Sequence, residues 1–327
     1  MSTSKPRVTI VGLGLIGGSI GLALRQAEVV STVMGHDKER AVGDEAKKRG
    51  AVDRVHWNLI SACEDADLVI LATPVAGIEE TLKAIGPTLR PGCVVIDTAS
   101  LKGPVMGWAE AYLPDQIHFI GADPILSTGT NGQGGLGAAR ADLFQRGLFC
   151  LIPPLKADSD SVKLASDLVS ILGARPLFMD AAEHDGLLAG VEHLPTLVAL
   201  AMLEAMIDQP AWRELRRVAG PAFELATQLV TEDSMMNRDL YLLNRDNLVR
   251  WIDVLTASLD SIRESLAENQ PEVLSQRWQK AMQEKQKWLA DRTEGQWYEG
   301  PRTEIPRVTI ADTFFGAFWR RKPKEQR

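Results

Sequence analysis

A glycine-rich turn near the start of the chain has the composition and spacing of a dinucleotide-phosphate site. The apolar run 8–11 leads directly into the sequence Gly-Leu-Gly-Leu-Ile-Gly at residues 12–17. Gly12 permits the tight turn, Gly14 lets the backbone approach a pyrophosphate, and Gly17 lets the following helix pack close to the strand. The free N–H groups and positive dipole end of that helix then suit the phosphates.

An acidic residue completes this pattern. Asp37 follows Gly17 by twenty residues, after a second expected strand, and its carboxylate can accept hydrogen bonds from both hydroxyls of an adenosine ribose. The same carboxylate would repel the 2′-phosphate of NADP, which favours NAD, although Lys38 and Arg40 nearby leave NADP open.

The composition is that of a soluble chain large enough for two domains. With 327 residues, of which 45% are hydrophobic and 24% charged, it can bury a substantial core. The net charge of −7 argues against a nucleic-acid-binding face, and no apolar stretch is expected to reach the length of a membrane span. Residues 1–7 do not resemble a signal peptide, so we expect a cytoplasmic protein with no nucleic acid or membrane as partner.

The thiols and imidazoles are not spaced for a metal site. Cys63, Cys93 and Cys150 are widely separated and lie in or beside apolar segments, which favours reduced thiols packed in a core. The five histidines include no pair at the HxxxH spacing. We therefore expect no metal.

Strand-like and helix-like segments alternate through the first 180 residues. Apolar runs predict strands at 66–72, 93–97, 118–121, 148–152 and 176–179, with helical patterns at 78–85, 105–112 and 160–172. This alternation predicts an α/β fold with a Rossmann-type doubly wound parallel sheet. Ligands bind such sheets at the carboxyl ends of the strands, so the important loops follow Val11, Leu71, Ile96 and Ile120.

Strand signals vanish from Ala181 onward, which predicts an all-α dimerisation and substrate domain. Helical patterns cover about 184–206, 212–231, 237–267 and 270–291. One apolar stripe indicates either a core face or a subunit interface; it comprises Leu240, Leu243, Asn247, Trp251, Leu255 and Leu259. We place the domains at 1–180 and 181–295, with an aromatic-rich tail at 296–327 that we expect to dock in part on a surface.

Several segments resemble the prephenate/arogenate dehydrogenases, which are NAD(P)-dependent enzymes of tyrosine biosynthesis. The matching stretches are 8–19 (VTIVGLGLIGGS), 35–37 (GHD), 66–75 (ADLVILATPV), 97–102 (DTASLK), 138–144 (AARADLF), 183–185 (EHD) and 193–195 (HLP). The resemblance covers about residues 7 to 268. It implies a Rossmann domain followed by a helical domain that dimerises, with substrate bound in the cleft between them.

The chain differs from the family at positions that bind or react with substrate. The family's catalytic histidine, which accepts a hydrogen bond from the ring hydroxyl as hydride and carbon dioxide leave, is matched here by Asp123. A carboxylate can act as a base, but an exposed aspartate is a weak one and adds negative charge beside an anionic substrate. The family's second histidine is matched by Thr196, and its carboxylate-binding arginine by Gln228, which loses a bidentate guanidinium.

Four retained side chains are further candidates. Ser100 stands where the family has a hydroxyl near the nicotinamide and the substrate's ring hydroxyl. Lys102 either contacts substrate or is a solvated loop lysine. His184, beside Asp185, either takes part in catalysis or caps its helix, and His193 either faces the substrate or packs within the helices.

These arguments give one set of site residues. We expect the catalytic residues to be Asp123, Ser100 and His184. Substrate is expected to contact Ser100, Lys102, His193 and Gln228. The cofactor, NAD with NADP not excluded, is expected to contact Gly12, Gly14, Leu15, Ile16, Gly17, Asp37, Thr73, Pro74 and Ser100.

The expected function is that of an NAD(P)-dependent dehydrogenase, with oxidative decarboxylation of prephenate or a related small molecule. One alternative is an enzyme like the β-hydroxyacid or imine dehydrogenases, which share the Rossmann opening and a helical dimer domain. Another is an NAD(H)-binding homologue without turnover. The matches at 97–102 and 184–185 favour the first. We also expect a homodimer through the helices after Ala181.

Overall fold

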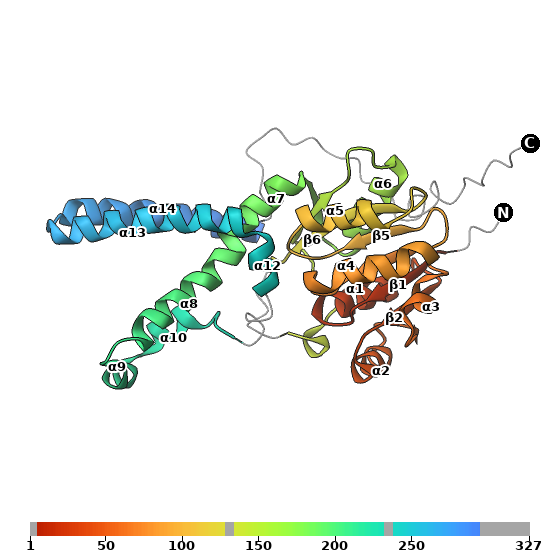
Figure 1. The fold of residues 1–327 in the computed structure, drawn as a ribbon, viewed down its shortest axis with the longest axis horizontal. Coiled ribbons are helices and arrows are strands. Elements are labelled where there is room, and N and C mark those ends of the chain that lie inside the picture. The colour runs from red at the N-terminus through yellow and green to blue at the C-terminus, as the bar shows by residue number, and fades with distance from the viewer. Residues whose placement is uncertain (1–4, 128–133, 232–237, 295–327) are drawn as a thin grey trace, which may run out of the picture. The chain divides into compact units, whose positions relative to one another are not determined.

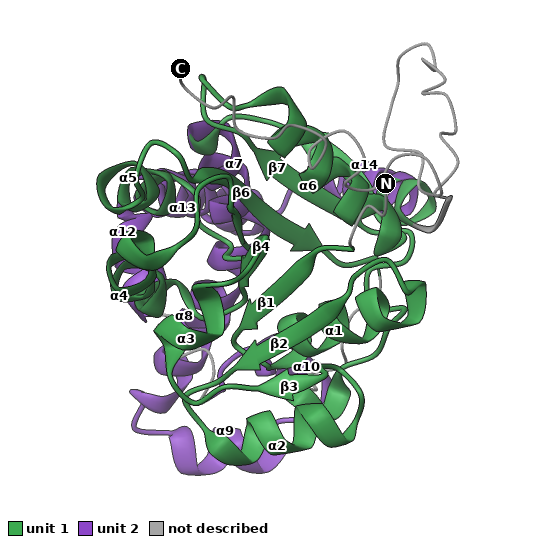
Figure 2. Cartoon of the chain, turned by 90° about the vertical axis from the view of Figure 1, so that its right-hand side faces the viewer, with its two compact units in different colours: residues 1–181, 288–327 green, residues 182–287 purple. Residues whose placement is uncertain are grey.

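The computed structural model describes residues 5–127, 134–231 and 238–294, which fall into two compact units (Figure 2). Unit 1 comprises residues 1–181 together with the chain from 288 onward, and unit 2 comprises residues 182–287. The predicted tail at 296–327 lies outside the described residues, and the domain boundaries predicted at 180 and 295 stay predictions.

A sheet of eight strands forms the centre of unit 1 (Figure 1), in the order β3-β2-β1-β4-β5-β6-β7-β8. The strands are β1 (Arg7–Val11), β2 (Thr32–His36), β3 (Arg54–Val55), β4 (Leu68–Leu71), β5 (Val94–Asp97), β6 (His118–Ile125), β7 (Leu148–Ile152) and β8 (Arg175–Phe178). Neighbouring strands from β3 to β6 pair in parallel, and the strand order reverses between β1 and β4. The predicted Rossmann-type fold is therefore confirmed, with its ligand-binding edge at the carboxyl ends of β1 and β4.

The sheet departs from a parallel arrangement at one pair of strands. β6 and β7 run antiparallel, and β7 then pairs with β8 in parallel. A parallel return needs a crossover of a dozen or more residues that is usually helical, whereas the described part of the β6–β7 connection holds only the 3₁₀ turn η2 (Leu136–Ala138). The apolar run at β7 does not reveal this direction, because buried strands of either direction are rich in apolar residues.

Helices cover both faces of the sheet. They are α1 (Leu15–Ala27), α2 (Arg40–Lys48), α3 (Leu59–Cys63), α4 (Val75–Ile85), α5 (Gly103–Tyr112) and α6 (Ser159–Ile171), with a 3₁₀ turn η1 (Gly86–Thr88). α1 contacts α6, whereas α4 contacts both α3 and α5, which places helices in two layers. Because both faces are covered, a strand such as β4 is buried at all four positions.

Unit 2 is helical, as predicted. Its elements are α7 (Ala181–Leu188), the π-helical turn η3 (Ala189–His193), α8 (Leu194–Ile207), α9 (Trp212–Val218), α10 (Pro221–Thr227), α12 (Arg238–Leu243), α13 (Arg245–Ala267) and α14 (Pro271–Glu294), of which α14 runs on into unit 1. The single helix predicted over 212–231 is wrong, since Gly220 interrupts it and Pro221 starts a new helix. α13 and α14 lie side by side (Figure 1), and Arg277 donates a 2.7 Å hydrogen bond to the Ser261 hydroxyl.

The continuous helical segment Ala181–Ile207 corrects the expectation that no apolar stretch reaches the length of a membrane span. By length and composition alone this segment is long and apolar enough, with 28% of its apolar window buried within the chain. Its exposed apolar side chains include Val191, Val198 and Leu200.

The cysteines are reduced and packed, as predicted. Cys63, Cys93 and Cys150 are buried and form no disulfide. Burial raises the pKa of the Cys63 thiol to about 12, and burial together with the nearby Cys63 raises that of Cys93 to about 12. These thiols therefore stay protonated at neutral pH and serve as small apolar groups.

Candidate functional site

The turn between β1 and α1 closes tightly because two of its residues have no side chain. Gly12 has φ +89°, and a Cβ there would lie 2.4 Å from the carbonyl oxygen of Ala72 in the loop after β4. A Cβ on Gly17 would lie 1.9 Å from the carbonyl oxygen of Gly12. Both positions therefore require glycine, and the helix start lies directly against the end of the strand.

Gly14 is glycine for a different reason. No atom lies within 4 Å of the position that its Cβ would occupy, and its φ of −70° is accessible to any residue. The start of α1, where Leu15 and Ile16 lie, has no capping side chain and no acidic residue in the first turn. Open space beside uncapped helix N–H groups fits the diphosphate of a dinucleotide, so these residues suit NAD.

Two backbone N–H groups hold the Asp37 carboxylate just after β2. Its two carboxylate oxygens accept backbone N–H groups, Oδ2 from Leu13 at 2.8 Å and Oδ1 from Glu39 at 2.9 Å. The strand before it is tied to the turn, since Gly12 N–H donates to the His36 carbonyl at 2.9 Å. Each oxygen retains lone-pair capacity, so the carboxylate is pre-oriented for the two ribose hydroxyls.

The loop after β4 contributes Thr73 and Pro74. Thr73 Cγ2 would be 3.0 Å from a Cβ on Gly12, so this loop contacts the glycine turn. The Thr73 hydroxyl is buried and has no hydrogen-bond partner among the described residues. Pro74 is exposed and precedes α4. A buried hydroxyl without a partner is costly, and a polar group of a bound cofactor would satisfy it.

A buried ion pair lies at the end of β5, beside the middle of β6. Lys102 and Asp97 have fully buried side chains and form a direct salt bridge. The prediction that Lys102 is a solvated loop lysine is therefore wrong, because its ammonium neutralises a carboxylate inside the fold. Burial raises the pKa of the Asp97 carboxyl, and the Lys102 ammonium opposes that rise.

This ion pair also holds the backbone of Ala122. Ala122 N–H donates to Asp97 Oδ1 at 3.2 Å, and its carbonyl accepts from Lys102 Nζ at 2.7 Å. β5 ends at Asp97 while β6 continues, so the two side chains replace a neighbouring strand for Ala122. Asp97 Oδ2 also accepts from Ala99 N–H at 3.0 Å, which fixes the loop that carries Ser100.

Asp123 follows this restrained residue directly. It is buried, with 4% exposure, in the part of β6 that pairs with β7, opposite Cys150. Ser100 is half-buried in the loop between β5 and α5. Unit 1 therefore places the glycine turn, Thr73 and Ser100 after β1, β4 and β5, on the ligand-binding edge, with Asp123 on the extension of β6.

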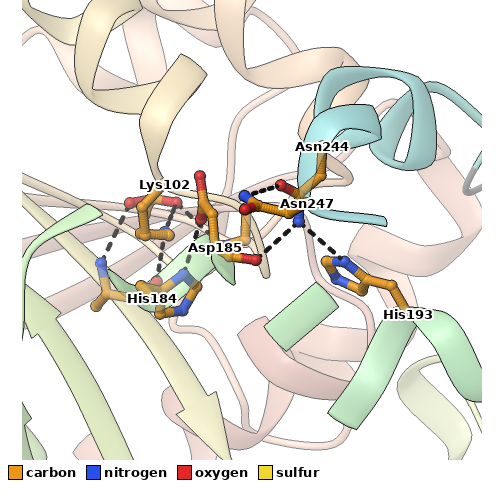
Figure 3. Close-up of polar contacts among 9 residues, drawn as sticks. Lys102, His184, Asp185, His193, Asn244 and Asn247 are labelled. Atoms are coloured by element: carbon orange, nitrogen blue, oxygen red, sulfur yellow. Dashed lines mark hydrogen bonds and ion pairs between the residues drawn. The ribbon is translucent and has the colours of Figure 1, made fainter. Parts of the chain in front are cut away.

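Unit 2 contains the predicted histidines and a residue that the sequence reasoning missed. His184 and His193 are both buried, His184 in the middle of α7, so the prediction that it lies at a helix start is wrong. His184 Nδ1 lies 2.9 Å from Asp185 Oδ1. Asn244 is buried, and its amide nitrogen donates to the Asp185 carbonyl at 2.9 Å and lies 3.4 Å from His193 Nδ1 (Figure 3).

Gln228 and Thr196, which match substrate-binding positions of the family, are more exposed than the two histidines. Gln228 is exposed at the end of α10, and Thr196 is half-buried in α8. Among the described residues no group of three His, Cys, Asp or Glu side chains is arranged to hold a metal ion. The missed residues had weak signals. Asp97 is the charged end of an apolar strand, and Asn244 lies inside the single helix predicted over 237–267, which the structure divides at this residue into α12 and α13.

The glycine geometry predicts separate effects at two positions. Gly14→Ala should leave thermal stability unchanged and weaken NADH binding at least about tenfold, or 1.4 kcal/mol, because the new methyl group projects into the open space. Gly12→Ala should lose stability, about 1–3 kcal/mol from backbone strain alone. NADH fluorescence titration and thermal melts measure both.

The control for that pair is Gly107→Ala. Gly107 is exposed within α5 with nothing near its Cβ position, so alanine there should retain NADH affinity and stabilise the helix by up to about 1 kcal/mol. Unchanged NADH affinity in Gly14→Ala would contradict the assignment of this space to the diphosphate.

The burial of the ion pair predicts that removing one partner lowers stability more than removing both. Lys102→Met leaves the Asp97 carboxylate buried without its cation and should lower the free energy of unfolding by about 3–5 kcal/mol. Asp97→Leu/Lys102→Met buries no lone charge and should lose less than Lys102→Met. Lys163→Met, which breaks the exposed Lys163–Asp167 pair, should change stability only slightly. Equal, small losses in all three variants by urea denaturation would show that the buried pair carries no such role.

Comparison with known proteins identifies the family. Residues 20–177 match the model for the prephenate dehydrogenase nucleotide-binding domain, and residues 180–284 match the model for the prephenate dehydrogenase dimerization domain. The chain is 30% identical over 270 residues to prephenate dehydrogenase of Bacillus subtilis (strain 168), covering 80% of this chain and 71% of that protein. It is 28% identical over 262 residues to cyclohexadienyl dehydrogenase of Zymomonas mobilis, covering 80% and 88% respectively.

A solved structure agrees with these matches. The crystal structure of prephenate dehydrogenase from A. aeolicus in complex with hydroxyphenyl propionate and NAD+ superposes with a TM-score of 0.80 at 26% sequence identity, covering 88% of this chain and 99% of that one. The matched models together span most of the sequence, in the same order as the Rossmann and helical elements described above. The chain therefore belongs to the prephenate dehydrogenase family.

Proposed function

We propose that the protein is an NAD-dependent dehydrogenase that oxidises and decarboxylates a ring-hydroxylated acid of the prephenate or arogenate type. The observation that carries this proposal is the open, uncapped start of α1 at Gly14, beside a pre-oriented Asp37. Family membership supports the reaction, because the relatives matched over most of the chain are prephenate and cyclohexadienyl dehydrogenases. NAD is favoured over NADP because the Asp37 carboxylate would oppose a 2′-phosphate.

Bound NAD+ supplies the hydride acceptor. The residues of this chain orient the substrate and hold its hydroxyl proton. Ser100 offers a hydroxyl beside the ring hydroxyl of the substrate, and Asp123 accepts a hydrogen bond from that hydroxyl as it becomes a carbonyl. Asp123 is restrained through Ala122, whose N–H and carbonyl are both held by the buried ion pair. A fixed acceptor requires little reorganisation during the reaction.

The expected substrate-binding residues of this chain differ in charge from those of the family. Gln228 offers an amide where the family has a guanidinium, and an amide binds a carboxylate less strongly than a bidentate cation does. Asp123 adds a negative charge where the family has an imidazole. Both changes favour a substrate with one carboxylate fewer than prephenate, and His184 and His193 are the retained groups that act on it. Lys102 acts indirectly, because its buried ammonium holds Asp97 and the Ala122 carbonyl.

The assembly that we propose is a cytoplasmic homodimer formed through unit 2, with no nucleic acid or membrane as partner. The matched dimerization model covers residues 180–284, and exposed apolar side chains gather on its helices, among them Val191 at 74% and Leu259 at 57% exposure. A second copy of this chain would bury that surface, including the apolar segment Ala181–Ile207.

Turnover tests the proposed reaction. The wild type should form NADH from NAD+ with prephenate, arogenate or a mono-carboxylate analogue of them. Asp123→Ala should lower kcat by about 10²-fold or more with NADH affinity unchanged, since it removes only the acceptor of the ring hydroxyl. Asp123→His/Gln228→Arg restores the family's side chains and should favour prephenate.

The outcomes separate the alternatives. An inert wild type with an active double variant would mean a family scaffold with a different substrate. A wild type and double variant that both bind NADH yet turn over nothing would overturn the proposal in favour of a cofactor-binding homologue without turnover.

Light scattering tests the dimer. Val198→Glu places a charge on the exposed apolar face of α8 and should convert a dimer at micromolar concentration into monomers. The matched control is Leu155→Glu, at a fully exposed position of unit 1, which should leave the dimer intact. A monomeric wild type, or a Val198→Glu variant that remains dimeric, contradicts this interface.

A further inference from the structure

The two buried histidines of unit 2 differ in the partner of their Nδ1 atoms. One Nδ1 lies beside a hydrogen-bond acceptor and the other beside a donor. His184 Nδ1 lies 2.9 Å from Asp185 Oδ1, and an ionised carboxylate can only accept a hydrogen bond. The proton of a neutral His184 ring is therefore on Nδ1, which leaves the lone pair on Nε2.

The partner of His193 is the side-chain amide of Asn244. Hydrogen bonds to its oxygen and to its nitrogen both indicate which way this amide is oriented. Asn247 Oδ1 accepts from Arg250 Nη2 at 3.3 Å, and a guanidinium only donates. Asn247 Nδ2 then donates to Asn244 Oδ1 at 2.8 Å. At the other end, Asn244 Nδ2 donates to the Asp185 carbonyl at 2.9 Å, which only accepts.

The neighbour of His193 Nδ1 is therefore a hydrogen-bond donor. The same Asn244 Nδ2 lies 3.4 Å from His193 Nδ1 (Figure 3), so the ring accepts there and carries its proton on Nε2. We propose that unit 2 holds His184 and His193 in opposite tautomers, with Asn244 as the positioning residue for His193. His184 then presents an accepting Nε2, and His193 a donating one.

The backbone around His193 is built to hold this arrangement. The π-helical turn η3 ends at His193, and such turns are frequent at functional sites. Trp251 of α13 fills the space beside η3, because a Cβ on Gly190 would lie 2.6 Å from its ring. The Trp251 Nε1–H donates to the Gly186 carbonyl at 2.9 Å, which fixes α13, and hence Asn244 and Asn247, against the histidines.

The consequence for substrate rests on the proposed function. A donating Nε2 on His193 suits a carboxylate or carbonyl oxygen of the substrate, which is the kind of group that Gln228 holds less strongly than an arginine would. An accepting Nε2 on His184 suits a hydroxyl. The two imidazoles therefore differ in the kind of substrate group that each can bind.

Nitrogen NMR of the full-length protein, labelled with ¹⁵N-histidine and measured near pH 8, tests the proposal without substrate. His184→Gln and His193→Gln assign the two rings. We expect the His193 Nδ1 resonance to be that of a lone-pair nitrogen and its Nε2 that of an N–H, with the reverse for His184. The same tautomer for both rings, or a protonated His193 Nδ1, would overturn the proposal.

A variant tests the role of Asn244. Asn244→Asp offers an acceptor in place of a donor, so the His193 proton should move to Nδ1 while His184 stays unchanged. In turnover assays the same variant should raise KM more than it lowers kcat. The matched control is Asn58→Asp, at a helix N-cap of unit 1 where a carboxylate accepts the Ser61 N–H equally well. An unmoved His193 proton in Asn244→Asp contradicts the proposal, whereas a moved proton in an enzyme without turnover would contradict only the proposed function.

Discussion

The close approach of β1, α1 and the loop after β4 is the constraint on which the cofactor site depends. Two missing side chains, at Gly12 and Gly17, let a helix start directly against a strand end. That approach leaves the first N–H groups of α1 without a side-chain cap, a feature that lowers helix stability unless another group accepts from them. The fold thus forms an anion site from backbone alone, and Asp37 and Thr73 add the polar groups around it.

The buried Asp97–Lys102 pair restrains the candidate site at the neighbouring strands β5 and β6. A charge inside a sheet is costly unless its partners are well placed, and here the pair does what a neighbouring strand would do for Ala122. The residue after Ala122 is Asp123, and the loop between Asp97 and Lys102 carries Ser100. One ion pair therefore restrains both candidate groups for the ring hydroxyl. At the position that matches the family's imidazole, the restrained residue is Asp123.

The sequence predicted the features that depend on local geometry. The glycine turn, Asp37 and the order of strands and helices follow from short-range patterns, and the structure has them. The burial of Lys102 could not be predicted, because it depends on the end of β5 lying beside Ala122 of β6, which is distant in the chain. The antiparallel β7 was missed because buried strands of either direction share an apolar composition. Asn244 was missed because its amide has a partner only once α13 packs against η3.

Recognition of an adenine dinucleotide by the first half of the chain is the central requirement for the proposed function. Titration calorimetry of the full-length protein with NAD+ and, separately, with NADP+ tests this most directly. We predict saturable binding of NAD+ at one site per chain, with weaker binding of NADP+ because of the Asp37 carboxylate. The absence of a saturable heat with either nucleotide would contradict the account.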